Sequence, residues 1–160
     1  MFYRIFGITF LAVYFLTLNA YPQEPVEVKK TSGKVTLDGL STEAVWNNIP
    51  SLPFITHQPV FGAEPSEKIE VLLIYDDKYL YIAGRLFDRE PEKMLITSKK
   101  RDVMQPQNEW FGIILDTYND NENALGFFTT PAGLRTDATV FNDAVGEIPV
   151  NSSWNTFWDV

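Results

Sequence analysis

Alternation of apolar and polar residues is the dominant pattern along this chain. It is clearest over residues 69–87, where two alternating runs flank a polar break at 76–78. Two such runs joined by a short polar turn predict a β-hairpin. Further strands are predicted over residues 34–38, 54–58, 94–98, 110–117, 124–130 and 134–141, of which 110–117 is apolar on both faces. Turn-forming residues separate these segments, and this order of elements favours an all-β fold.

Only one short helix is expected, over residues 41–48. Ser41 or Thr42 would cap it, and Trp46 would point from its apolar side into the core. The prediction is therefore an antiparallel β-sandwich with immunoglobulin-like or jelly-roll-like layers. The chain ends on Phe157-Trp158-Asp159-Val160, which resembles the start of another strand. We expect the last strands of the sandwich to be missing, and the alternative is a natural chain ending on an edge strand.

The first twenty residues follow a different pattern. Arg4 precedes an uncharged apolar stretch over residues 5–18, and Asn19-Ala20 follow it. This is the layout of a secretory signal peptide, and the stretch is shorter than the roughly 20 apolar residues of a membrane-spanning helix. An uncleaved membrane anchor is the alternative. We expect a signal peptide at 1–20, a linker at 21–33 and a sandwich domain at 34–160, exported to the periplasm, the outer membrane or the extracellular space.

Composition narrows the classes of function. The 160 residues include 13 Lys+Arg and 21 Asp+Glu, which gives a net charge of −8. This acidic balance argues against a nucleic-acid partner, because no surplus of cations is present to replace the counterions of a phosphate backbone. The chain has no Cys and a single His, His57, which removes disulfides, cysteine–zinc sites and most acid–base triads.

Several segments together resemble a known family. They are Asp38-Gly39, Trp46, residues 71–88 (VLLIYDDKYLYIAGRLFD), Arg101-Asp102, residues 110–138 (WFGIILDTYNDNENALGFFTTPAGLRTDA) and residues 154–160 (WNTFWDV). They resemble carbohydrate-binding module family 9 from about Val35 to Val160. The branch that looks most similar is a family-9-like domain of bacterial envelope proteins, found behind a signal peptide and before a region resembling an outer-membrane β-barrel.

The resemblance implies a β-sandwich that binds a polysaccharide or oligosaccharide without catalysing a reaction. It also implies that a downstream β-barrel region of the same protein is a possible partner, that calcium could serve a structural role, and that the longer parent protein could be linked to glycoside hydrolysis. Three positions depart from the family's sugar-binding residues. Pro106 aligns with a stacking tryptophan, Gly112 with a glutamate and Phe128 with an arginine. These departures imply an alternative, a degenerate sandwich that acts as a structural or docking domain for the barrel and has no glycan ligand.

Sugar recognition requires aromatic faces beside polar groups that bind hydroxyls. Trp154 and Trp158 alternate with polar residues near the end of the chain, and Trp110 is a further candidate platform. Arg101, Asp102 and Glu109 form the candidate polar cluster, in which Asp102 would orient the guanidinium of Arg101. The structural alternatives are that Trp158 belongs to the core, that Trp154 covers a loop and that Arg101 and Asp102 form a surface ion pair.

Catalysis by this domain is not expected. Glu109 and Asp116 are separated by an odd number of positions, so on one strand their carboxylates would lie on opposite faces and could not flank a glycosidic bond. No cofactor is expected. The oxygen-rich segment 119–123 lacks the glycine and the final acidic residue of an EF-hand loop, which favours a solvated turn.

Overall fold

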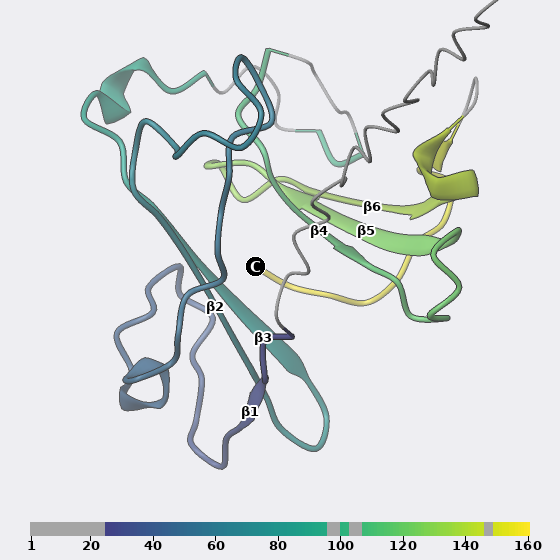
Figure 1. Cartoon of the computed structure of the whole chain (residues 1–160). Coiled ribbons are helices and arrows are strands. Elements are labelled where there is room, and N and C mark those ends of the chain that lie inside the picture. Colours follow the sequence, from purple (N-terminus) through teal and green to yellow (C-terminus); the bar gives the residue numbers. More distant parts are fainter. Residues whose placement is uncertain (1–24, 96–99, 103–106, 146–148) are drawn as a thin grey trace, which may run out of the picture.

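The chain is all-β in the parts that the computed structural model describes, which are residues 25–95, 100–102, 107–145 and 149–160 (Figure 1). A three-stranded sheet has the order β1-β2-β3, and a four-stranded sheet has the order β4-β5-β6-β7. The strands are β1 (Lys29–Lys30), β2 (Ile69–Tyr75), β3 (Leu80–Leu86), β4 (Phe111–Leu115), β5 (Ala124–Thr129), β6 (Arg135–Val140) and β7 (Val150–Asn151). Three short 3₁₀ helices complete the described elements: η1 (Ala44–Trp46), η2 (Pro91–Lys93) and η3 (Asn142–Ala144). The predicted all-β class is confirmed.

The predicted hairpin over residues 69–87 is confirmed as β2 and β3, which pair antiparallel from Ile69 opposite Leu86 to Tyr75 opposite Leu80. Local side-chain chemistry explains why the chain turns between them. Asp76 Oδ1 accepts hydrogen bonds from the backbone N–H groups of Lys78 at 2.7 Å and Tyr79 at 2.8 Å. One carboxylate therefore satisfies two backbone donors of the turn.

The core of the first sheet lies on the face that carries Leu72, Ile74 and Ala83. The η1 helix covers this face with Trp46, of which only 6% is exposed. The prediction of a helix with a buried Trp46 is thus confirmed, although the helix is shorter than expected. The predicted cap by Ser41 or Thr42 is wrong, because Glu43 is the N-cap and makes no capping side-chain hydrogen bond. Its carboxylate instead accepts from Trp46 Nε1 at 3.2 Å and from the Thr36 N–H at 2.7 Å.

The second sheet divides its side chains between two faces according to the strand register. Ile113 pairs with Phe127, and Phe127 pairs with Asp137, so these three residues share one face. Gly126 and Ala138 belong to the other face, together with Phe128, Gly112 and Ile114. A Cβ atom at Gly112 would lie 2.6 Å from the Phe128 ring, and one at Gly126 would lie 2.7 Å from it. The two glycines therefore make room for this ring.

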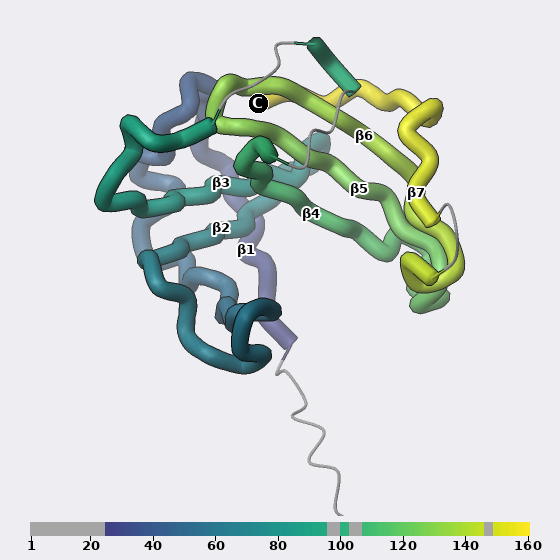
Figure 2. The backbone as a smooth tube through the Cα atoms, turned by 90° about the horizontal axis from the view of Figure 1, so that it is seen from above, coloured from purple at the N-terminus to yellow at the C-terminus, as the bar shows by residue number. Residues whose placement is uncertain are grey.

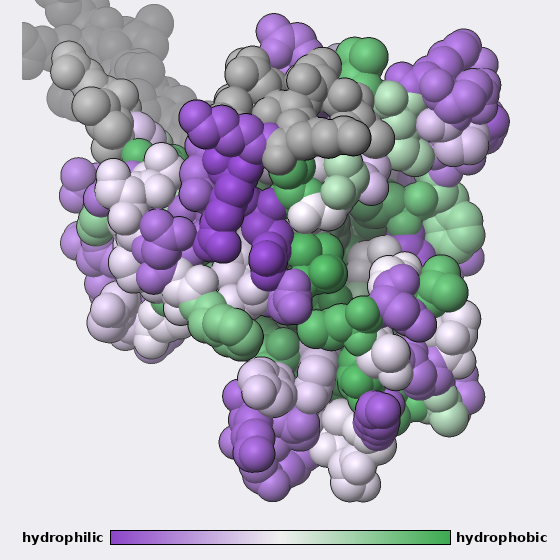
Figure 3. Space-filling model, turned by 180° about the vertical axis from the view of Figure 1, so that it is seen from behind, coloured by the Kyte–Doolittle hydropathy of each residue, from purple (hydrophilic) through white to green (hydrophobic). Residues whose placement is uncertain are grey.

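The two sheets touch where β3 and β4 approach each other. The Phe111 ring covers Gly84, so that a Cβ at Gly84 would lie 3.1 Å from the ring. The strands β2 and β3 run obliquely to β5 and β6 in Figure 1, and Figure 2 shows β4 as the outer strand of its sheet. Seen from behind, apolar residues gather across the middle of the molecule around a hollow (Figure 3).

Some predicted strands are wrong. Residues 34–38 form no strand, since the Thr36 N–H bonds to the Glu43 carboxylate and the Leu40 N–H to Asp38 Oδ1 at 2.9 Å. Residues 54–58 form a loop that is closed by a hydrogen bond from the Thr56 N–H to the Ala63 carbonyl at 2.7 Å. In both segments, a central backbone N–H group bonds locally and not to a neighbouring strand.

Other predicted boundaries also shift. Strand β1 lies inside the predicted linker 21–33, and it pairs in parallel with β2. The predicted strand at 94–98 is not formed at residues 94–95, and residues 96–98 lie outside the described part of the chain. The predicted strand start at residues 157–160 is also not formed. The expected signal peptide at 1–20 and Pro106 lie outside the described residues.

Candidate functional site

The C-terminal segment brings two of the predicted tryptophans onto one ring of β5. Trp154 meets Phe127 at a centroid distance of 6.2 Å and an interplanar angle of 72°. Trp158 meets the same ring at 5.5 Å and 75°. Both indoles are half-buried. Because Phe127 shares its sheet face with Asp137, these contacts place residues 154–158 over the charged centre of that face.

Asp137 is the centre of the polar cluster and is fully buried, with 0% of its surface exposed. Its Oδ1 accepts a hydrogen bond from Arg101 Nη2 at 2.7 Å, and its Oδ2 accepts one from the Thr156 N–H at 2.6 Å. Burial opposes the ionisation of this carboxyl group. The Thr156 N–H, the Arg101 guanidinium and the nearby Trp158 indole outweigh burial and lower the pKa of Asp137. The indole Nε1 of Trp158 itself is buried without a hydrogen bond of normal geometry.

Arg101 is held by three neighbours. Besides Asp137, its Nη2 donates to Asn155 Oδ1 at 3.2 Å, and its Nε lies 3.5 Å from Asp102 Oδ2. The hydrogen bond to Asp137 is the main cause that raises the pKa of Arg101. The side chain remains 43% exposed. The guanidinium is thus fixed on its inner side while part of it reaches the solvent.

A second arginine on the same face, Arg135, binds the C-terminal segment at Trp158 and Asp159. Arg135 Nη1 donates to the Trp158 carbonyl and to Asp159 Oδ1, each at 2.7 Å. Arg135 and Asp137 are alternate residues of β6, so they project from the same face. The Arg135 carbonyl also accepts from the Asp102 N–H at 3.3 Å, which ties Arg101 and Asp102 to the edge of the site.

Four of the six predicted site residues are therefore brought together around β5 and β6: Arg101, Asp102, Trp154 and Trp158. Glu109 and Trp110 stand at the start of β4, where Glu109 is exposed and Trp110 is half-buried. No hydrogen bond or ion pair among the described residues joins Glu109 to the cluster. Sequence reasoning missed Asp137 and Arg135. Their signal was two opposite charges at alternate positions of a strand whose other face carries Thr136, Ala138 and Val140.

In the oxygen-rich turn after β4, the Asp120 carboxylate accepts hydrogen bonds from within the turn. Asp120 Oδ1 accepts from the backbone N–H groups of Glu122 at 2.9 Å and Asn123 at 2.8 Å. The Asn123 side chain donates to Asp120 Oδ2 at 2.8 Å, and this hydrogen bond is the main cause that lowers the pKa of Asp120. These contacts are those of the solvated turn favoured by the sequence. Within the described residues, no group of three or more acidic or histidine side chains is placed to hold a metal ion.

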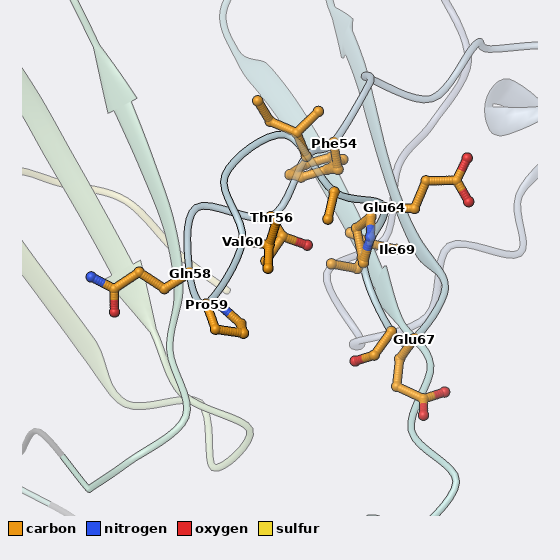
Figure 4. A pocket seen from close by; sticks show the side chains of 12 residues that line it. Phe54, Thr56, Gln58, Pro59, Val60, Glu64, Glu67 and Ile69 are labelled. Carbon is orange, nitrogen blue, oxygen red and sulfur yellow. The ribbon is translucent and has the colours of Figure 1, made fainter.

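An open groove of about 510 Å³ lies apart from this cluster, along the loop that precedes β2 (Figure 4). Its lining is mainly apolar and includes Phe54, Val60 and Ile69. The carboxylates of Glu64 and Glu67 point away from these side chains in Figure 4. The groove lacks the combination of a fixed cation and aromatic rings that the cluster around Asp137 offers, so the cluster is the candidate site.

Comparison with known proteins adds no relative. No family model matches the chain, and neither a curated protein nor a solved structure matches it. In the described part of the chain, no helix has the length and apolarity needed to cross a membrane. The functional argument therefore rests on the geometry of the cluster.

Proposed function

We propose that this domain is a non-catalytic carbohydrate-binding module of the β-sandwich type, within a secreted or envelope-associated protein. The observation that carries the proposal is the Arg101 guanidinium, which a buried Asp137 fixes beside the Asn155 amide and two indoles. A pyranose ring has an apolar C–H face and a rim of hydroxyl groups. An aromatic face and a fixed polar fork are complementary to these two parts.

Each group has a separate role in this proposal. Arg101 donates hydrogen bonds to two neighbouring sugar hydroxyls, and the Asn155 amide supplies a donor and an acceptor at the next position. A T-shaped contact with Phe127 occupies at most one face of each indole. The other face of half-buried Trp154 is the surface on which the sugar ring stacks. Asp137 positions Arg101 and does not touch the sugar.

The test is calorimetric titration of the chain with a panel of soluble gluco-, xylo- and manno-oligosaccharides. The proposal predicts saturable binding that weakens about tenfold or more in Arg101→Lys, because lysine keeps the ion pair with Asp137 and loses the planar fork. Trp154→Ala is predicted to weaken binding as well. Tyr118→Ala is the matched control, since Tyr118 is 73% exposed in the turn after β4, and no ring contact among the described residues joins it to the cluster. Equal affinity of Arg101→Lys and the wild type would refute the role of Arg101.

One observation favours a second function, that of a structural or docking domain without a glycan ligand. Asp137, Arg135 and Phe127 all hold the C-terminal segment on the sheet. A cluster with that purpose would stabilise the fold without binding sugar. Under this second function no oligosaccharide of the panel produces heat, and Arg101→Lys changes only the free energy of unfolding.

A further inference from the structure

Among the described residues, β4 has no strand partner at its outer edge. β4 is the end strand of its sheet and has a strand partner, β5, on one side only (Figure 2). Among the described residues, no backbone hydrogen bond reaches the side of β4 that faces away from β5. An edge strand presents a row of backbone donors and acceptors to which another strand can pair.

The sequence of β4 carries none of the usual protection of an edge. Its residues, FGIIL, include no charge and no proline, and Ile114 is 59% exposed. The other outer strands differ, because β3 contains Arg85, which is paired with Glu70, β1 consists of two lysines, and β7 is only two residues long. Charged side chains on an edge oppose pairing with another chain. β4 is therefore the edge that favours association.

We propose that β4 pairs antiparallel with β4 of a second copy of this chain, in the register centred on Ile113. Phe111 then faces Leu115 of the second copy, and Gly112 faces its Ile114. Gly112 has no side chain, and the Phe128 ring lies over it at a distance where a Cβ would be 2.6 Å away. Ile114 of the second copy therefore packs against this ring without a clash.

The charges that flank β4 favour the same register. The chain carries a net charge of −8, so two copies repel each other unless their carboxylates are kept apart. With Ile113 at the centre, Glu109 faces Thr117 and Asp116 faces Trp110. A slip of one residue in one of the two directions would instead place Glu109 opposite Asp116, and like charges directly opposite each other are destabilising. The slip would also turn the Phe111 face outward.

Sedimentation velocity of the full chain over a dilution series tests the association. A concentration-dependent dimer is expected, and Ile114→Lys is expected to be monomeric because it places a charge on the pairing edge. Tyr118→Lys introduces the same charge at an exposed position just beyond the strand and is expected to remain dimeric. Circular dichroism establishes that both variants keep their strands. A wild-type chain that remains monomeric at every concentration overturns the proposal, as does an Ile114→Lys variant that dimerises as the control does.

Cysteine cross-linking tests the register, since the chain has no cysteine of its own. In the proposed pairing Ile113 lies opposite Ile113, so Ile113→Cys forms a disulfide-linked dimer on mild oxidation. The two copies of position 114 are diagonal neighbours, about 7–8 Å apart, which is beyond ready disulfide formation. Faster cross-linking of Ile113→Cys than of Ile114→Cys supports the register. Equal rates, or the reverse order, overturn it. Neither experiment depends on glycan binding.

Discussion

Replacement of Asp137 by asparagine tests the central contact of the candidate site with little change in shape. Asp137 accepts two short hydrogen bonds, from Arg101 Nη2 and from the Thr156 N–H, while it is fully buried. Asparagine keeps one acceptor oxygen and turns an NH₂ group toward the other donor, so that one hydrogen bond is lost. A hydrogen bond to a charged group contributes about 1.5–3 kcal/mol, and we expect Asp137→Asn to lower the free energy of unfolding by about 2 kcal/mol.

The assay is urea denaturation followed by tryptophan fluorescence, because Trp154 and Trp158 both pack on the face that Asp137 organises. With a typical denaturant dependence, a loss of about 2 kcal/mol lowers the midpoint by about 1 M urea. Asp77→Asn is the matched control. Asp77 pairs with Lys30 at the surface with 85% of its side chain exposed, and such pairs contribute under about 1 kcal/mol. Equal midpoints for Asp137→Asn and Asp77→Asn would show that the buried carboxylate does not stabilise the fold.

Three further outcomes follow from the same structure. The pKa of Asp137 is lower in the folded chain than the unfolded value of about 3.9. The ionised carboxylate therefore contributes fully to stability above that pH, and this contribution is lost as the pH falls through the lowered pKa. Measurements of the free energy of unfolding at decreasing pH should show this loss in the wild type and not in Asp137→Asn. Trp46→Ala should lower the free energy of unfolding by about 3–5 kcal/mol in chemical denaturation, because the buried indole leaves a cavity, and a loss below about 1 kcal/mol would contradict its place in the core. Gly126→Ala should cost about 1–3 kcal/mol, since its Cβ would lie 2.7 Å from the Phe128 ring, and an unchanged melting temperature would refute that packing.

The parts of the fold that sequence reasoning predicted are those that local chemistry determines. The hairpin of β2 and β3 is specified within one segment, because the alternation and the turn carboxylate of Asp76 act together. Trp46 was placed correctly because a tryptophan on a short apolar helix has few other positions to occupy. Residues 34–38 show the limit of the method. Their alternation suits a strand, but a strand also needs a neighbour, and here Glu43 takes the Thr36 N–H instead.

The candidate site was predicted only in part for the same reason. Arg101, Asp102, Trp154 and Trp158 were chosen by residue type, without knowledge of what would hold them. Asp137 is 36 positions from Arg101 and 19 from Thr156, so no local pattern connects it with either residue. A charged residue inside a strand is ordinarily interpreted as facing solvent. Its burial becomes understandable only once the register places Asp137 beneath the C-terminal segment.

The double role of Asp137 makes two events thermodynamically inseparable. One carboxylate bonds to the guanidinium on one side and to the backbone of the last segment on the other. A ligand that binds Arg101 is therefore expected to favour the docked position of residues 154–158 on the sheet. By reciprocity, detachment of that segment lowers the affinity for the ligand by the same factor. Ligand binding should therefore slow amide hydrogen exchange at Thr156 and make the C-terminal segment more resistant to proteolysis.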